Sequence, residues 1–158
     1  AVYLQAVAAL PLPRRLDPTL IRLGGWRELA AAVAARARTE RASFVVSDSY
    51  GDAALLARLL PADIPVVGAD QRWAVFALPD AAPLIAGRDG LLLRSGRRSD
   101  PPDASDWAQM QPVGEVSRAR GAIVAETYRL YRVVGGRPTP PLPVVVLPRP
   151  RSDACLLC

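Results

Sequence analysis

The clearest pattern in the chain is a stretch of apolar residues at helical spacing in its first third. Charged residues take most of the positions between them, and the pair Gly24-Gly25 comes just before the stretch. We therefore predict an amphipathic helix over Trp26–Glu40. Its apolar face consists of Trp26, Leu29, Ala30, Val33 and Ala37.

The next elements alternate between strand and helix patterns. The run Ser43–Ser47 is short and apolar at its centre, which is typical of a buried strand. A longer apolar run predicts a helix over Tyr50–Leu60, and Pro61 follows it directly. Val66-Val67-Gly68 then predicts a second short strand. Strand and helix in this order are typical of a βαβ unit with a parallel sheet.

The second half of the chain has short apolar runs separated by turns and polar stretches. Leu91–Leu93 predicts a buried strand after a turn at Asp89-Gly90, and alternating residues predict a hairpin around Arg120-Gly121. We expect one α/β domain in a three-layer-like arrangement, with a βαβ first half and a mixed sheet that the C-terminal β-hairpin completes. The remaining expected elements are hairpin strands at Val113–Arg118 and Ala122–Val134, a strand or short helix at Arg72–Leu78, a helical turn at Pro79–Ile85, a loop at Arg97–Ser105 and an edge strand at Val144–Leu147.

Composition excludes several classes of chemistry. The chain has 158 residues, 51% of them hydrophobic and 22% charged, which is enough to bury a core. It contains no His, and all 20 basic residues are Arg. Ser-His-Asp and Cys-His catalysis, lysine Schiff bases and histidine zinc sites are therefore excluded. The net charge of +5 invites a nucleic-acid interpretation, but the arginines are scattered and no aromatic residues interleave them. We expect no nucleic-acid partner.

The two ends of the chain differ in composition from the middle. Ala1–Leu12 is almost wholly apolar, and as a helix it would span about 18 Å, short of the roughly 30 Å of a bilayer core. It is either a core element or the end of a truncated transmembrane helix. Residues 13–23 are expected to form a linker, 24–135 the soluble domain and 136–158 a proline-rich tail. Cys155 and Cys158 lack the further ligands that zinc needs, so we expect no metal and no cofactor.

The best local candidate for a site lies between the first predicted strand and the helix that follows it. Asp48, Ser49, Tyr50 and Asp52 occupy this position, where open α/β sheets place their ligands. The spacing of Ser49 and Asp52 is typical of a capping box, which is the simpler interpretation, and the alternative is a contact to a metal or a sugar. A second group of carboxylates lies in the polar loop, without the fixed separation that glycoside chemistry needs. That group consists of Asp100, Asp103 and Asp106.

Four segments occur together in an order that resembles one known family. The chain is similar to the C-terminal soluble domain of bacterial membrane glycosyltransferases related to protein O-mannosyltransferases and to lipid A aminoarabinose transferase. The resemblance covers about residues 10–135. The segments that carry it are Gly25-Trp26-Arg27-Glu28-Leu29-Ala30, the run from Phe44 to Ala54, Arg72-Trp73 and Tyr128-Arg129-Leu130-Tyr131.

The resemblance implies that residues 1–12 end a transmembrane helix and that the domain lies on the periplasmic side of the bacterial inner membrane. The parent enzyme would move a sugar from a polyprenyl-phosphate donor to a lipid, glycan or protein. The family's catalytic carboxylates lie in the membrane part, so we expect no catalytic residue in this chain. Its partners would be that membrane part of the same polypeptide and a lipid-linked sugar or acceptor. The strand end Asp48–Asp52 and Arg72 would face the parent's cavity.

Two other interpretations of the sequence remain open. A free-standing α/β domain could bind a nucleotide or another anionic ligand at the same strand end. A structural domain with this net charge could instead contact anionic lipid.

Overall fold

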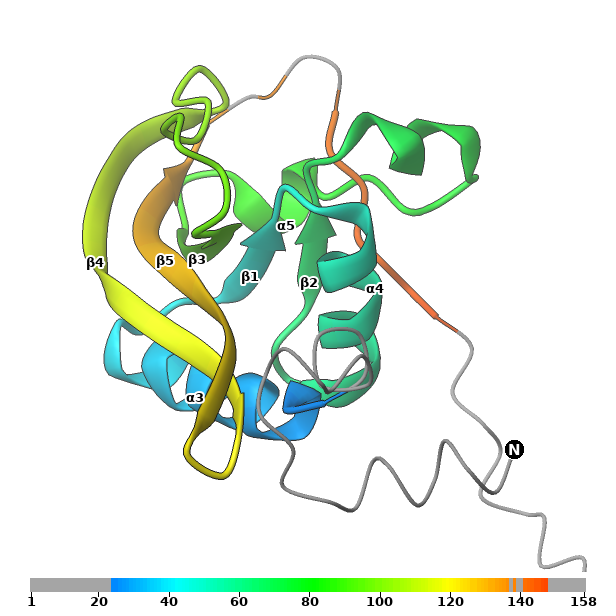
Figure 1. The fold of residues 1–158 in the computed structure, drawn as a ribbon. Coiled ribbons are helices and arrows are strands. Elements are labelled where there is room, and N and C mark those ends of the chain that lie inside the picture. The colour runs from blue at the N-terminus through cyan, green and yellow to red at the C-terminus, as the bar shows by residue number, and fades with distance from the viewer. Residues whose placement is uncertain (1–23, 137, 139–140, 148–158) are drawn as a thin grey trace, which may run out of the picture.

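A five-stranded mixed sheet organises the part of the chain that the computed structural model describes, residues 24–136, 138 and 141–147 (Figure 1). The strand order is β2-β1-β3-β5-β4. The first three strands are parallel to one another, and the last two form an antiparallel hairpin beside them. The predicted α/β fold with a C-terminal hairpin is thus confirmed. The strands are β1 (Phe44–Ser47), β2 (Val66–Gly68), β3 (Asp89–Ser95), β4 (Trp107–Arg120) and β5 (Ile123–Gly135).

Two helices cover one face of the sheet. They are α3 (Trp26–Thr39) and α4 (Tyr50–Leu59), within one residue of the predicted ranges. Their apolar faces pack on the strand residues that point to that side, including Val45, Leu91 and Leu130. The opposite face is covered by the short helix α5 (Ala82–Ile85) and by the segment around Leu142. Both faces of β1 and β3 are therefore buried, as their unbroken apolar sequences indicate.

The start of α4 places the candidate site residues. The Ser49 hydroxyl accepts a hydrogen bond from the Asp52 amide at 3.5 Å, so Ser49 caps the helix. The Ser49 amide donates to the Ser47 hydroxyl at 3.2 Å. In a full capping box that amide would instead donate to the carboxylate of Asp52.

Several sequence-based expectations are corrected by the structure. Asp89-Gly90 is not a turn, because both residues belong to β3, and Gly90 pairs with Phe44 of β1. A side chain at Gly90 would overlap the Phe44 ring, which explains the glycine. The first hairpin strand, β4, is longer than expected, whereas β5 is shifted by one residue from its predicted range, and the chain turns at residues 121–122. The predicted edge strand at Val144–Leu147 forms only an isolated bridge between Val144 and Val67. Of the two alternatives expected for Arg72–Leu78, the structure has the short helix, η2 (Gln71–Val75).

Some expectations fall on residues outside the described ranges. These are the apolar segment Ala1–Leu12, the linker at 13–23 and the two cysteines. Among the helices of residues 24–136 and 141–147, none is long and apolar enough to cross a membrane. Within 141–147, Leu142 and Val145 are buried against the sheet.

Candidate functional site

A cavity of about 550 Å³ lies at the carboxyl ends of the three parallel strands. This is the edge at which open α/β sheets bind ligands, and the volume falls within the usual range of small-molecule sites. Its walls are the strand ends, the loop between β3 and β4, and residues 141–143. The side chains and backbone that define it are those of Asp48, Gly68, Asp70, Leu92, Arg94, Arg98, Asp103, Asp106, Trp107 and Leu142.

An ion pair joins the ends of the two central parallel strands. Arg94, at the end of β3, is only 4% exposed and donates to the carboxylate of Asp48, which follows β1. Arg98 approaches the same carboxylate oxygen at 3.4 Å from the exposed side. The other carboxylate oxygen of Asp48, Oδ1, is buried and accepts no hydrogen bond from the described residues. This ion pair holds the ends of β1 and β3 together at the floor of the cavity. The strand order reverses between these two strands.

The loop that forms one wall of the cavity is held by two arginines. Arg94 donates to the carboxylate of Asp100 and, at 3.1 Å, to the Asp100 carbonyl. Arg129 of β5 donates to the carbonyl of Arg98 and to that of Asp100, the latter at 3.4 Å. Because these donors come from the sheet, the loop has a defined position over the strand ends without a helix of its own.

The cavity is acidic, and its carboxylate oxygens can accept hydrogen bonds from the hydroxyl groups of a ligand. Four carboxylates and two guanidinium groups line it, a formal balance of −2. Burial raises the pKa of Asp106, and the neighbouring Asp103 adds to the rise. The indole of Trp107 supplies an apolar surface and stacks on Phe44, with ring centroids 6.2 Å apart. Carboxylates beside an aromatic surface suit a ligand rich in hydroxyl groups and oppose an anion.

Tyr50 and Arg72 are near the cavity but do not line it. The Arg72 guanidinium donates to both carboxylate oxygens of Asp70, at 2.9 and 2.8 Å, and lies 5.0 Å from the Tyr50 ring centroid. The Tyr50 amide donates to Asp70 at 3.3 Å. These bonds, with that from the Arg72 side chain foremost, lower the pKa of Asp70 to about 2. Asp70 therefore stays ionised at the cavity rim.

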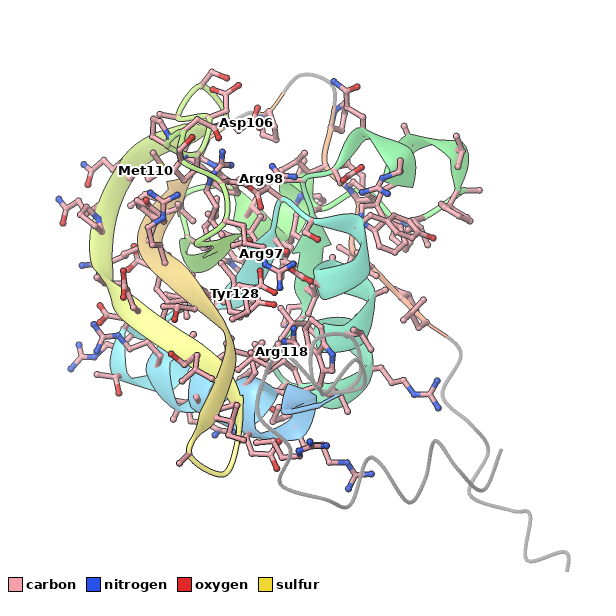
Figure 2. All side chains as sticks on the ribbon, viewed as in Figure 1. Arg97, Arg98, Asp106, Met110, Arg118 and Tyr128 are labelled. Carbon is pink, nitrogen blue, oxygen red and sulfur yellow. The ribbon has the colours of Figure 1, made fainter. Side chains whose placement is uncertain are left out.

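A second polar cluster lies on the helix-covered face of the sheet. Glu126 of β5 accepts from Ser95 at 2.5 Å and pairs with Arg97 at 3.3 Å and Arg118 at 3.4 Å. Figure 2 shows Arg97, Tyr128 and Arg118 following one another between β5 and α4. Asp52 faces this cluster from α4. Burial, followed by the charge of Glu126, raises the pKa of Asp52 to about 6.

The raised pKa of Asp52 predicts a pH dependence of stability. In the unfolded chain this carboxyl titrates near 3.8, so the folded chain binds the proton more tightly. The free energy of unfolding should fall by about 2 kcal/mol as the pH rises from about 4 to about 6. Asp52→Asn should remove that contribution and be more stable than the parent chain at pH 8. Urea unfolding at a series of pH values measures both.

An exposed carboxylate provides the control for this prediction. Asp63 lies in the loop after α4, and Asp63→Asn should keep the pH profile of the parent chain. An Asp52→Asn profile that coincides with the parent's between pH 4 and 6 would show that Asp52 is not the group responsible.

The sequence located part of the cavity. Of the five residues predicted for the site, Asp48 lines the cavity and Ser49 caps α4. Tyr50 and Arg72 flank Asp70 at the cavity rim. Asp52 instead faces the polar cluster on the helix-covered face of the sheet. Sequence reasoning missed Asp70 and Arg94. Each of them follows or ends a predicted parallel strand, as Asp48 does, and this shared position was the available signal.

Comparison of the chain with protein-family models, with curated proteins and with solved structures found no match. The geometry and chemistry of the cavity are therefore what bears on function.

Proposed function

We propose that this chain is a non-catalytic accessory domain of an integral-membrane glycosyltransferase, and that its carboxyl-edge cavity binds the sugar part of a donor or acceptor. The observation that carries the proposal is the lining of the cavity. The carboxylates of Asp103 and Asp106 line the cavity and can accept hydrogen bonds from hydroxyl groups, and Trp107, only 8% exposed, lines it beside them.

The charge balance favours this function over the anion-binding alternative. Arg94 is already occupied by two carboxylates, and Arg98 is shared with Asp48. Asp48 and Asp70 are paired with arginines as well, so the negative character of the cavity comes from Asp103 and Asp106, which no ion pair among the described residues neutralises. A nucleotide phosphate would meet repulsion from these two carboxylates. In a phosphate-linked sugar, the sugar would enter the cavity and the phosphate would stay outside it.

The sequence resemblance supports the accessory role. The cavity is built partly by the segments that carry the resemblance, since Asp48 and the strand before it belong to one of them. In this proposal the membrane part of the same polypeptide supplies the catalytic carboxylates, and the domain lies on the periplasmic side of the inner membrane.

Thermal unfolding with a panel of ligands tests the binding function. We expect neutral mono- and oligosaccharides to stabilise the chain and nucleotides to have no effect. A ligand present at 100 times its Kd stabilises by about 2.7 kcal/mol, which such an assay resolves. Asp106→Asn and Asp103→Asn should reduce the stabilisation by a sugar, whereas Asp63→Asn should preserve it.

The opposite ranking, with nucleotides stabilising and sugars inert, would contradict the proposal. The coding sequence upstream of Ala1 provides an independent test of the accessory role. A series of apolar spans is expected there, and a start codon directly before Ala1 would contradict it.

A further inference from the structure

Apolar side chains are exposed together on one short segment, residues 74–79, which we call the apolar ridge. Val75 is 81% exposed and Phe76 47%. Ala74, Ala77 and Pro79 are exposed as well. In Figure 1 the region around η2, coloured green, stands out to one side beyond the carboxyl ends of the strands. Exposed apolar residues that are contiguous in this way are candidates for an interaction surface.

The apolar ridge is rigidly mounted on the domain. Trp73 is buried over Gly68, where a side chain would overlap its indole. The Trp73 ring centroid lies 4.3 Å from that of Tyr50 and 5.7 Å from that of Phe76. The Phe76 amide donates to the Trp73 carbonyl at 3.1 Å. The ridge is therefore preorganised, and little conformational entropy is lost when it binds.

Of the two charged residues beside the apolar ridge, Arg72 is paired within the domain, and Asp80 is held by a backbone amide. On one side Arg72 forms a bidentate pair with Asp70. On the other side the Asp80 carboxylate accepts from the Ala82 amide at 2.8 Å. Residues 73–79 carry no charge. The tip can therefore leave water without stripping an unpaired charge of its solvent.

The size of the apolar ridge favours a lipid surface as its partner. A stable protein interface takes about 20–30 residues from each side, and the ridge has six, on a projecting tip. A small tip with an aromatic and an aliphatic side chain suits the boundary between headgroups and acyl chains. We propose that the apolar ridge inserts into a bilayer surface through Val75 and Phe76. This inference goes beyond the sugar-binding proposal and does not depend on it.

A fluorescent label read against lipid vesicles tests this insertion. An environment-sensitive dye would be attached at Val75→Cys in a Cys155→Ser/Cys158→Ser background. The matched control is Val124→Cys in the same background, because Val124 is 43% exposed at the hairpin end of the sheet. With phosphatidylcholine vesicles, the dye at position 75 should shift to shorter wavelength and be quenched by nitroxide lipids. The dye at position 124 should change in neither respect.

Charged substitutions provide the second measurement. Without a dye, Val75→Asp and Phe76→Asp should each lower the partition coefficient of the chain between vesicles and water at least tenfold, and Val124→Asp should leave it unchanged. Circular dichroism checks that each variant is folded. If Phe76→Asp does not fold, Val75→Asp still tests the proposal, because the Val75 side chain is 81% exposed and its replacement should leave the fold intact.

Three results would overturn the insertion proposal. Vesicle binding that leaves the dye at position 75 in water would show that another part of the chain, such as residues 1–12, makes the contact. Binding that needs phosphatidylglycerol and disappears in salt would show electrostatic adsorption. A dye shift in the absence of vesicles would show a contact between protein chains.

Discussion

Replacing Arg94 with methionine should lower the free energy of unfolding by about 3–5 kcal/mol. Methionine keeps the unbranched apolar stem but leaves the Asp48 carboxylate, itself only 14% exposed, without its main partner. The loop at residues 96–106 also loses the donor that reaches the Asp100 carbonyl. Urea unfolding at pH 7, followed by far-UV circular dichroism, measures the loss.

Two further variants distinguish the loss of the ion pair from other effects of replacing an arginine. Arg88→Met replaces an exposed arginine just before β3 and should change the free energy of unfolding by less than about 0.5 kcal/mol. The double variant Asp48→Asn/Arg94→Met removes both charges and should recover much of the loss. If Arg94→Met lowers the free energy of unfolding by less than about 1 kcal/mol, the Asp48–Arg94 pair does not stabilise the ends of β1 and β3.

Replacing Arg118 with methionine should have an effect of similar size, about 3–5 kcal/mol. Arg118 is 1% exposed, and two of its contacts, to Gly24 and Trp26, link the hairpin to the start of α3. It donates to the Gly24 carbonyl at 2.7 Å, pairs with Glu126 and lies 4.6 Å from the Trp26 ring centroid. Methionine removes all three and leaves Glu126 near the buried Asp52. Urea unfolding again gives the magnitude.

The near-ultraviolet circular dichroism of the tryptophans reports on the same variant. Loss of the cation over Trp26 should change that spectrum at urea concentrations where the chain is still folded. The matched variant Arg27→Met, exposed at the start of α3, should change neither the spectrum nor the free energy of unfolding by more than about 0.5 kcal/mol. Equal stability of Arg118→Met and Arg27→Met would contradict a structural role for the buried guanidinium.

The elements with strong local signals were predictable from the sequence. The helical period and Gly25 defined α3, and Pro61 marked where α4 had to stop. The turn expected at Asp89-Gly90 shows where local signals fail. Asp-Gly is typical of turns, but pairing with β1 and packing of the Phe44 ring over Gly90 decide the conformation there. Tertiary contacts override such local preferences.

The candidate site was predictable only where one strand end defines it. Asp48 could be selected because it directly follows β1. Its partner Arg94 lies 46 positions later, and the two meet only because β3 pairs with β1. Trp107 reaches the same cavity through the order of β5 and β4 in the sheet. A single sequence does not specify such long-range pairing.

The measurement that tests the central claim most directly is an NMR titration of the isotopically labelled chain with neutral sugars and, separately, with a nucleotide. The account predicts that a sugar shifts the amide signals of Ala69 and Asp70, which follow β2, and of Trp107, which begins β4. Signals at the hairpin turn, residues 121–122, should not move. Sugar titrations that leave the cavity signals in place, while the nucleotide shifts them, would contradict the account.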